Sequence, residues 1–412
     1  MQQRALGCVL ALPLMLLAWA SPARAAEFSF SGFADARFVA EPETTDWLHG
    51  GLGKFRTGGD TAEMMVQGAG QGVLSFNDSL SLIAVVKADQ ETINGVDALE
   101  AYFSWHSTDE GRLSWSVKAG AFFPTISLEN DDIGWTSPYT ITWSAINTWI
   151  GEELRTLGGE GTLRLRTGTL GTFSLIGALD CCNDPTGILI ADRGWSIGDR
   201  ATGLFEHVRL PDATLKLFHL PYPGRTGEFD EIDHRVGWYG GLSWQMAGIG
   251  KLSVLRYENQ GDPSAEMDEN YAWETKFWSF GGRTQFGPLV LIVQDLTGYT
   301  AVEPVPNPEA VTKFQSAFLL ASYDLGGLGF EDWRASARAE FFQTRHLAAA
   351  PHPLSEDGRA MTLSLSWQPL ESFRLTGETV LMHSRRGEYL RVGLPSDQLG
   401  NGEFLLNARI FF

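Results

Sequence analysis

The sequence predicts an all-β chain that folds as a closed antiparallel transmembrane β-barrel of about 18 strands, within a range of roughly 16 to 18. Three observations lead to this prediction. Apolar and polar residues alternate along most of the chain, short connections alternate with long ones, and the last segment alternates up to an aromatic terminal residue. In such a barrel the short connections are periplasmic turns and the long ones are extracellular loops.

The composition is that of a folded chain rich in turns. Of 412 residues, 43% are hydrophobic and 20% are charged, and 46 glycines with 12% aromatic residues favour β structure. The 31 basic and 50 acidic residues give a net charge of −19. Because a nucleic-acid-binding face needs a basic patch, we expect no nucleic-acid partner.

The first 25 residues are expected to be a secretory signal peptide. Arg4 precedes an apolar run from Val9 to Ala20, and Ala23-Arg24-Ala25 has the pattern of a cleavage site. A lipoprotein would need its apolar run before Cys8, and here the run follows it. We therefore divide the chain into a signal peptide, 1–25, and a single barrel domain, 26–412, whose net charge is −21 once Arg4 and Arg24 are removed.

Strands are assigned from a period of two. In the first of them Phe28 and Phe30 alternate with Ser29 and Ser31, so that one face is apolar and the other polar. No later stretch has the ~18 to 20 apolar residues of a transmembrane helix. The same period places strands at 28–40, 63–76, 79–89, 97–106, 112–122, 154–166, 172–180, 201–209, 213–220, 235–246, 250–258, 273–286, 289–298, 314–323, 333–343, 360–368, 371–382 and 403–412.

The connections between these strands differ in length in a regular way. Asn77-Asp78, Gly287-Pro288 and Pro369-Leu370 are short, whereas the connections on the opposite side, such as 41–62 and 123–153, are long. A soluble sandwich or propeller has no reason to lengthen every second connection. A barrel of the bacterial outer membrane has this asymmetry.

The end of the chain resembles the terminal strand of Gram-negative outer-membrane proteins, which the barrel-assembly machinery recognises. The alternating residues are Phe404, Leu406, Ala408, Ile410 and Phe412. The architecture of the whole mature chain resembles porins and porin-like barrels. The segments 120–131 (GAFFPTISLEND) and 141–154 (ITWSAINTWIGEEL) resemble a poorly characterised group of proteobacterial outer-membrane proteins.

The resemblance implies an outer-membrane location, with membrane lipid, lipopolysaccharide and the assembly machinery as partners. It also implies passive diffusion of small hydrophilic solutes through a channel. The Pro-Glu-Phe-Gly loop signature of general trimeric porins is absent, so the oligomeric state stays open.

The longest expected loop, from Pro124 to Glu153, is the candidate constriction. It is the third long connection, and in porins the third outer loop bends inward. Its carboxylates attract cations, and its aromatic faces offer sugars or apolar solutes a sliding surface. Alternatively, the aromatic residues pack the loop against the wall or lie at the lipid interface. The candidates are Glu129, Asp131, Asp132, Trp135, Tyr139, Trp143, Trp149, Glu152 and Glu153.

Basic residues on the polar faces of the strands form a candidate wall of the lumen. A charge that faces lipid at the midplane costs ~2 to 4 kcal/mol, which favours the inward orientation. Such a wall opposite an acidic loop creates a transverse field. Alternatively, Asp35, Glu340 and Glu378 neutralise it. The wall residues are Arg37, Arg112, Lys118, Arg164, Arg166, Arg334, Arg338, Arg374 and Arg409.

Cofactors and metals are not expected. Cys181 and Cys182 are adjacent, so they cannot link distant strands, and they either form a vicinal ring or stay as thiols. No His or further Cys follows within about twenty residues to complete a metal site. The acidic groups between 228 and 233 lack the spacing of a calcium loop.

Catalysis is not expected either. The pairs His106-Ser107 and His383-Ser384 lie on strands, where adjacent side chains point to opposite faces and cannot form a dyad. We therefore expect a diffusion channel that favours cations or neutral polar solutes. The alternatives are a structural barrel, a substrate-specific export or uptake barrel, for example for saccharides, and an outer-membrane hydrolase.

Overall fold

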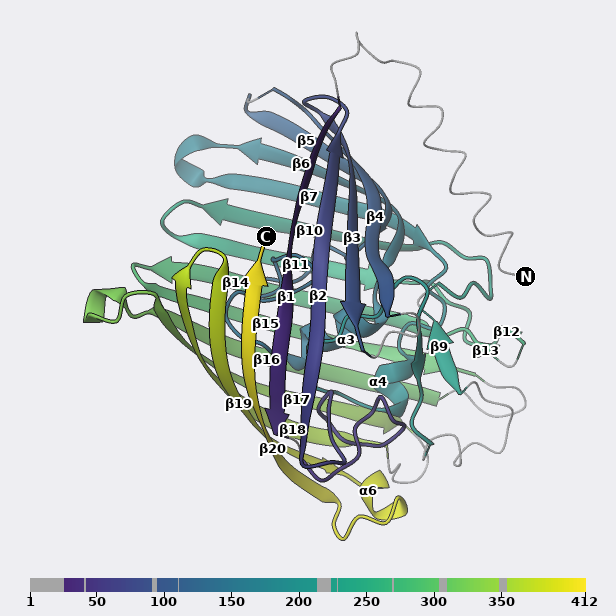
Figure 1. Cartoon of the computed structure of the whole chain (residues 1–412). Coiled ribbons are helices and arrows are strands. Elements are labelled where there is room, and N and C mark those ends of the chain that lie inside the picture. The colour runs from purple at the N-terminus through teal and green to yellow at the C-terminus, as the bar shows by residue number, and fades with distance from the viewer. Residues whose placement is uncertain are drawn as a thin grey trace.

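The strands form one closed ring and follow one another around it in chain order (Figure 1). The computed structural model describes residues 26–40, 42–90, 95–109, 111–212, 224–227, 229–268, 270–303, 310–347 and 354–412. The sixteen barrel strands are β1 (Glu27–Ala40), β2 (Ala62–Ser75), β3 (Leu80–Asp89), β4 (Val96–His106), β5 (Leu113–Phe122), β6 (Thr156–Arg166), β7 (Thr172–Cys181), β10 (Gly237–Met246), β11 (Gly250–Glu258), β14 (Glu274–Phe286), β15 (Leu289–Val302), β16 (Ala310–Asp324), β17 (Trp333–Leu347), β18 (Glu356–Leu370), β19 (Phe373–Arg386) and β20 (Gln398–Phe411).

The closed antiparallel barrel is confirmed, and its strand number lies at the lower end of the expected range. The expected barrel strand at 201–209 is wrong. Only β8 (His207–Arg209) forms there, and it pairs with β9 (Arg225–Gly227) in a separate sheet, while β7 pairs directly with β10. In this segment Glu206 binds Lys87 of the inner wall at 2.8 Å, so the alternation reflects packing inside the barrel. The expected strand at 213–220 lies outside the described residues.

The remaining elements lie in the connections. A second small sheet contains β12 (Glu266–Met267) and β13 (Asn270–Tyr271). The helices are α3 (Ala145–Glu153), α4 (Ile188–Asp192) and α6 (Glu388–Arg391), with 3-10 turns at Gly168–Leu170 and Gly326–Leu328. Among the residues that the structure describes, no helix combines the length and the apolar character needed to cross a membrane. The expected signal peptide, 1–25, lies outside the described residues.

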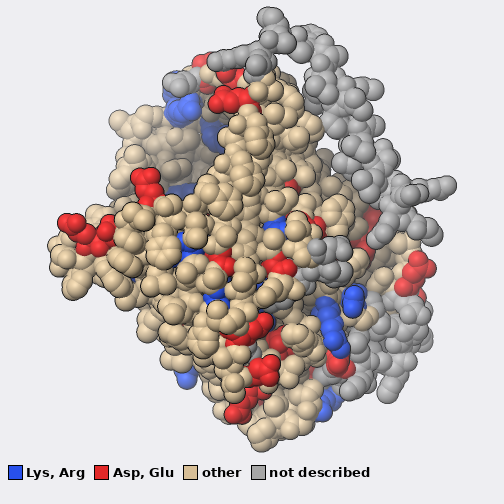
Figure 2. Space-filling view, in the orientation of Figure 1, with Lys and Arg blue, Asp and Glu red and all other residues tan. Residues whose placement is uncertain are grey.

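The two faces of the strands differ in burial as a period of two requires. In β1, Phe28 and Phe30 are 65% and 54% exposed on the outside, whereas Asp35 and Arg37 are buried inside. Most of the visible surface in Figure 2 is neither acidic nor basic. We call the end of the barrel with the short connections the turn end, and the opposite end the loop end.

The first and last strands close the ring. The backbone N–H of Gly32 donates to the carbonyl of Phe412 at 2.8 Å, and the N–H of Phe412 donates back at 3.0 Å. The ring of Phe412 stacks on Phe30 with centroids 5.7 Å apart. A Cβ at Gly32 would lie 2.9 Å from the Phe412 ring and 2.5 Å from the carbonyl oxygen of Ala69, so the close approach requires glycine.

Deletion of Phe412 is expected to lower the amount of assembled barrel and to raise periplasmic degradation. The residue is 59% exposed at the end of the closing strand, where a recognition element is accessible and little buried area is lost. Immunoblots of membrane and periplasmic fractions measure the effect. Phe28→Ala, which removes another exposed ring of the same face, is the matched control. Normal membrane levels of the deletion variant would contradict the expectation.

Three long connections fold into the barrel at its loop end. These are residues 42–61, 123–155 and the described parts of 182–236, and they include α3 and α4 (Figure 1). All residues of α3 and α4 are buried. We call the three inserted segments together the plug.

Candidate functional site

The plug has its own apolar core against the inner wall. The ring of Trp149 on α3 lies 6.0 Å from that of Trp195, 5.6 Å from that of Phe277 on β14 and 5.3 Å from that of Phe314 on β16. Helix α3 begins at Ser144, whose hydroxyl accepts a bond from the N–H of Asn147 and caps the helix. Loop 124–153 therefore packs inside the barrel against β14 and β16.

Three charged side chains of the wall hold residues 141–145, which lead into α3 and include its first residue. The carboxylate of Glu378 accepts the N–H groups of Ile141 and Thr142 at 2.6 and 2.8 Å, and Glu340 accepts that of Ala145 at 2.7 Å. The guanidinium of Arg338 donates to the carbonyls of residues 142 and 143 at 2.8 Å each. Strands β17 and β19 thus fix a loop that starts from β5.

The carboxylates of the loop separate into a buried group and an exposed group. Glu129 is fully buried, accepts the N–H of Ser144 and the amide of Asn147 at 2.8 Å each, and lies 3.6 Å from Arg338. Glu152 forms a buried ion pair with Arg193. These two carboxylates hold the plug and are not exposed to a passing solute.

Glu153 links the two helices of the plug. It accepts the indole N–H of Trp149 and, at 3.0 Å, the backbone N–H of Leu189 on α4. Burial raises the pKa of Glu153 to about 7, although the bond from Leu189 acts in the opposite direction. Because the buried acid is favoured in its protonated form, its contribution to plug stability is full below the usual pKa of Glu and is lost as the pH rises through about 7.

A second buried network joins the first and the fourth outer connections to the wall. Lys54 lies 2.7 Å from Glu356 on β18 and donates to the carbonyl of Arg193 at 2.9 Å. Burial lowers the pKa of Lys54 to about 8. Lys54, Arg193 and Trp195 are not among the residues predicted from the sequence. The apolar run 188–191 before Trp195, within an otherwise polar connection, is the signal that indicates a buried segment.

A third network lies beside the closing strands. Asp199 accepts Arg37 at 2.7 Å and Arg56 at 2.9 Å. Burial acts to raise the pKa of Asp199, but the two guanidinium groups outweigh it and hold the pKa well below its usual value. Arg409 forms a two-bond pair with Asp35, both bonds at 2.7 Å.

The structure brings only part of the expected basic wall together. The ion-paired members are Arg37, Arg338 and Arg409, which are buried against carboxylates. Arg374 lies opposite Arg409 in the register of β19 and β20. The others lie elsewhere. Lys118 is 3.6 Å from Glu160, Arg164 donates to Ser116, Arg166 donates to Gly111, and Arg112 is exposed just before β5.

Two loop carboxylates remain exposed toward the turn end. Asp131, whose side chain is 48% exposed, pairs with Arg283 of β14 at 2.7 Å. Burial raises the pKa of its neighbour Asp132, and the charge of Asp131 adds to the effect. Arg283 also donates to the hydroxyl of Tyr139 at 2.6 Å. Arg334 and Arg374, which begin strands β17 and β19, are half-buried at the same end.

The aromatic residues of loop 124–153 are packed inside the plug. Trp135, Tyr139, Trp143 and Trp149 are all buried, and Trp135 stacks on Phe123 with centroids 4.2 Å apart. This arrangement corresponds to the alternative in which the aromatic residues pack the loop.

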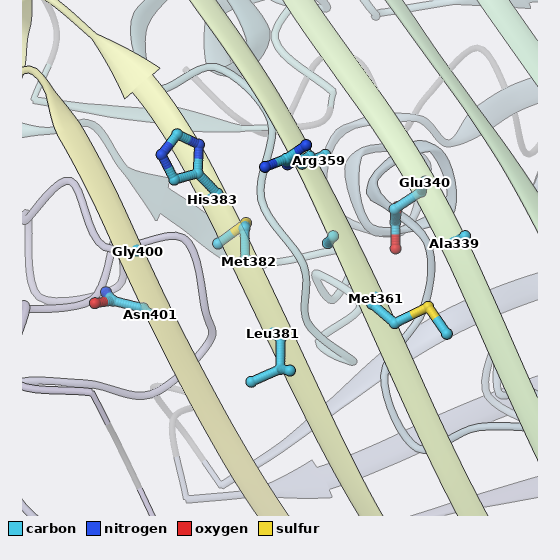
Figure 3. Close-up of a pocket in the computed structure, with 10 residues that line it drawn as sticks. Ala339, Glu340, Arg359, Met361, Leu381, Met382, His383, Gly400 and Asn401 are labelled. Carbon is cyan, nitrogen blue, oxygen red and sulfur yellow. The ribbon is translucent and has the colours of Figure 1, made fainter.

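A groove of about 630 Å³ is lined by residues of β17, β18, β19 and β20 from both faces of these strands (Figure 3). Arg359 and His383 are cross-strand neighbours there, and Met361 and Leu381 form the next such pair. Ser384 points to the opposite face, where its hydroxyl donates to Glu356 at 2.7 Å. His383 and Ser384 therefore form no dyad.

No protein-family model matches the chain, and no curated protein matches it. Solved structures do resemble it. OmpT of Vibrio cholerae is 10% identical, with a TM-score of 0.53 over 95% of this chain and 99% of that one. An anion-selective porin from Comamonas acidovorans is 12% identical, with a TM-score of 0.50 over 94% and 100%. OmpF of Salmonella typhi, in complex with daunomycin, is 12% identical, with a TM-score of 0.50 over 93% and 97%. The chain therefore has the fold of bacterial outer-membrane porins.

Proposed function

We propose that the protein is an outer-membrane channel for the passive diffusion of small hydrophilic solutes, constricted by the loop 124–153. Barrels of ~16 to 18 strands are too wide for side chains to fill and leave an aqueous lumen. The observation that carries the proposal is the attachment of this loop to Arg338, Glu340 and Glu378 on the far wall, which narrows such a lumen. The turn end would face the periplasm, and lipopolysaccharide would surround the loop end.

Neutral polar solutes are the class that the charges at the turn end favour. The expected preference for cations depended on three carboxylates, and one of them, Glu129, is buried and paired. The exposed Asp131 is compensated by Arg283, and Arg374 acts on Asp132 from the wall. Opposed charges across a passage create a transverse field that orients dipoles and discriminates weakly between ions of opposite sign.

Planar-bilayer recording of the refolded protein in a KCl gradient tests the proposal. Asp131→Asn with Asp132→Asn is expected to shift the reversal potential toward anions. One unit charge at about 7 Å in water contributes roughly 0.6 kcal/mol, or about a threefold change in local ion concentration. Glu266→Gln, in the outer connection between β11 and β14, is the control that leaves the constriction intact. A steady conductance with no shift in the double variant would refute the constriction, and no conductance at all would refute the channel.

A second candidate function is substrate-specific uptake, for example of a saccharide, through a barrel that is closed at rest. The observation that favours it is the extent of the plug, whose Trp149 and Trp195 are almost fully buried in the lumen. Such a barrel would show rare openings in the same recording, and its solute would increase them. An open diffusion channel would conduct steadily without any solute. In either case we propose transport and not catalysis.

A further inference from the structure

The two cysteines of the mature chain lie where β7 ends and the connection 182–236 begins. Both are free, and their Sγ atoms lie 2.7 Å apart. Cys182 is buried, and Cys181 is partly exposed. The pair is therefore a dithiol at the loop end of the barrel.

The last part of the same connection, which contains Glu231, lies beside this dithiol. The backbone N–H of Cys182 donates to the carboxylate of Glu231 at 2.9 Å. Both Sγ atoms and one oxygen of Glu231 lie within 4.8 Å of one another, and Glu231, Asp184 and Asp233 form a second group of the same size. Glu231 lies about fifty residues beyond the cysteines in the sequence, so it comes near them only in the folded connection.

A second observation, at Asp184, supports a cation at this place. Asp184 is completely buried, and its Oδ2 accepts the N–H groups of Ile232 and Asp233 at 2.5 and 2.9 Å. Its Oδ1 is also buried and accepts no hydrogen bond from the residues that the structure describes. A buried carboxylate oxygen without a donor costs ~1 to 3 kcal/mol or more, and a metal ion would satisfy it.

We propose that Cys181, Cys182 and Glu231 bind a thiophilic divalent cation of the Zn²⁺ class, and that Asp184, which is grouped with Glu231 but not with the thiols, moves in as the fourth ligand. Two thiolates and two carboxylates form a tetrahedral set with metal–sulfur bonds of about 2.3 Å and metal–oxygen bonds of about 2.0 to 2.2 Å. Hard cations such as Ca²⁺ take only oxygen ligands, so the thiols select against them. Binding displaces one proton from each thiol, and the two protons leave to solvent as two metal–sulfur bonds form.

The site would join the two ends of a connection that carries α4 and Trp195 into the lumen. A cation bound there would shorten the free length of this part of the plug and hold it at the wall. The effect on conductance rests on the proposed channel, but the binding of the metal does not. The experiment therefore reads metal binding directly.

The full mature protein is refolded in detergent with reductant, freed of metal by chelation and titrated with Cd²⁺. Charge-transfer absorption from thiolate to Cd²⁺ reports the binding, and Zn²⁺ is added as competitor. We expect one equivalent of Cd²⁺ per barrel. Cys181→Ser with Cys182→Ser should abolish the absorption, and Glu231→Gln and Asp184→Asn should each weaken binding at least ~10-fold.

Glu266→Gln, an exposed carboxylate outside the cluster, is the control that should leave the affinity unchanged. The gel mobility of each variant before and after boiling shows whether its barrel has closed, so that a folding defect is recognised. An affinity unchanged in Glu231→Gln and Asp184→Asn would overturn the proposal. A protein extracted without free thiols, with a mass lower by two hydrogens, would also overturn it in favour of a vicinal disulfide.

Discussion

Replacement of Arg338 by methionine is expected to release loop 124–153 from the wall and, if this loop narrows the proposed channel, to raise the single-channel conductance. Arg338 is fully buried, lies 3.0 Å from Glu340 and 3.6 Å from Glu129, and donates to two carbonyls of the loop. Methionine fills much of the volume but leaves both carboxylates without a counter-charge. The removal of one partner of a buried ion pair costs ~3 to 5 kcal/mol, which is enough to undock a loop from a wall.

Limited proteolysis of loop 124–153 and bilayer recording measure the effect. Arg334→Met is the matched control, because Arg334 lies four positions earlier on β17, is 32% exposed and interacts with the exposed Asp324. The control should keep the loop resistant to protease. If the Arg338→Met variant conducts like the wild type and its loop 124–153 stays resistant to protease, the contacts of Arg338 on β17 do not hold this loop in place.

Trp149→Ala is expected to destabilise the plug by ~3 to 5 kcal/mol, the usual cost of replacing a large buried aromatic residue by alanine. The substitution removes the ring that contacts Trp195, Phe277 and Phe314, and Glu153 loses the indole donor. The barrel itself does not depend on this ring. Denaturant titration should therefore show a plug transition at lower denaturant while the boiling-dependent gel shift of the barrel is kept.

Trp278→Ala provides the control for this prediction. Trp278 lies on the outer face of β14 and is 44% exposed, so its removal leaves the lumen unchanged. The plug transition should then stay at its wild-type midpoint. Equal shifts in the two variants would mean that the plug does not unfold separately from the wall.

The barrel could be predicted from the sequence because a lipid-facing residue must be apolar wherever the strand lies. On β1, for example, the apolar Phe28 and Phe30 are exposed on the outer face, whereas the charged Asp35 is buried on the inner face. It also explains the error at 201–209. That segment alternates because one side contacts the lumen wall, and a period of two is the same whether the apolar side contacts lipid or a plug.

The candidate site was less predictable, because it depends on partners that are distant in the chain. The sequence identified Glu129, Glu152 and Glu153 as loop carboxylates, but it does not show that Ser144, Arg193 and Leu189 bind them. The same holds for the cysteines, whose neighbours Asp184 and Glu231 meet only in the folded connection. Period and composition report the environment of a residue and not the identity of its partner.

The long-range contacts of the plug impose an order on folding. Lys54 meets Glu356, Ile141 meets Glu378, and Thr57 donates to Glu403 across a separation of 346 residues. The acceptors lie on β18, β19 and β20, so none of these pairs can form before the last strands have taken their places in the wall. Contacts of such sequence separation form slowly. We therefore expect the plug to dock late in folding, after the strands of the wall have been placed.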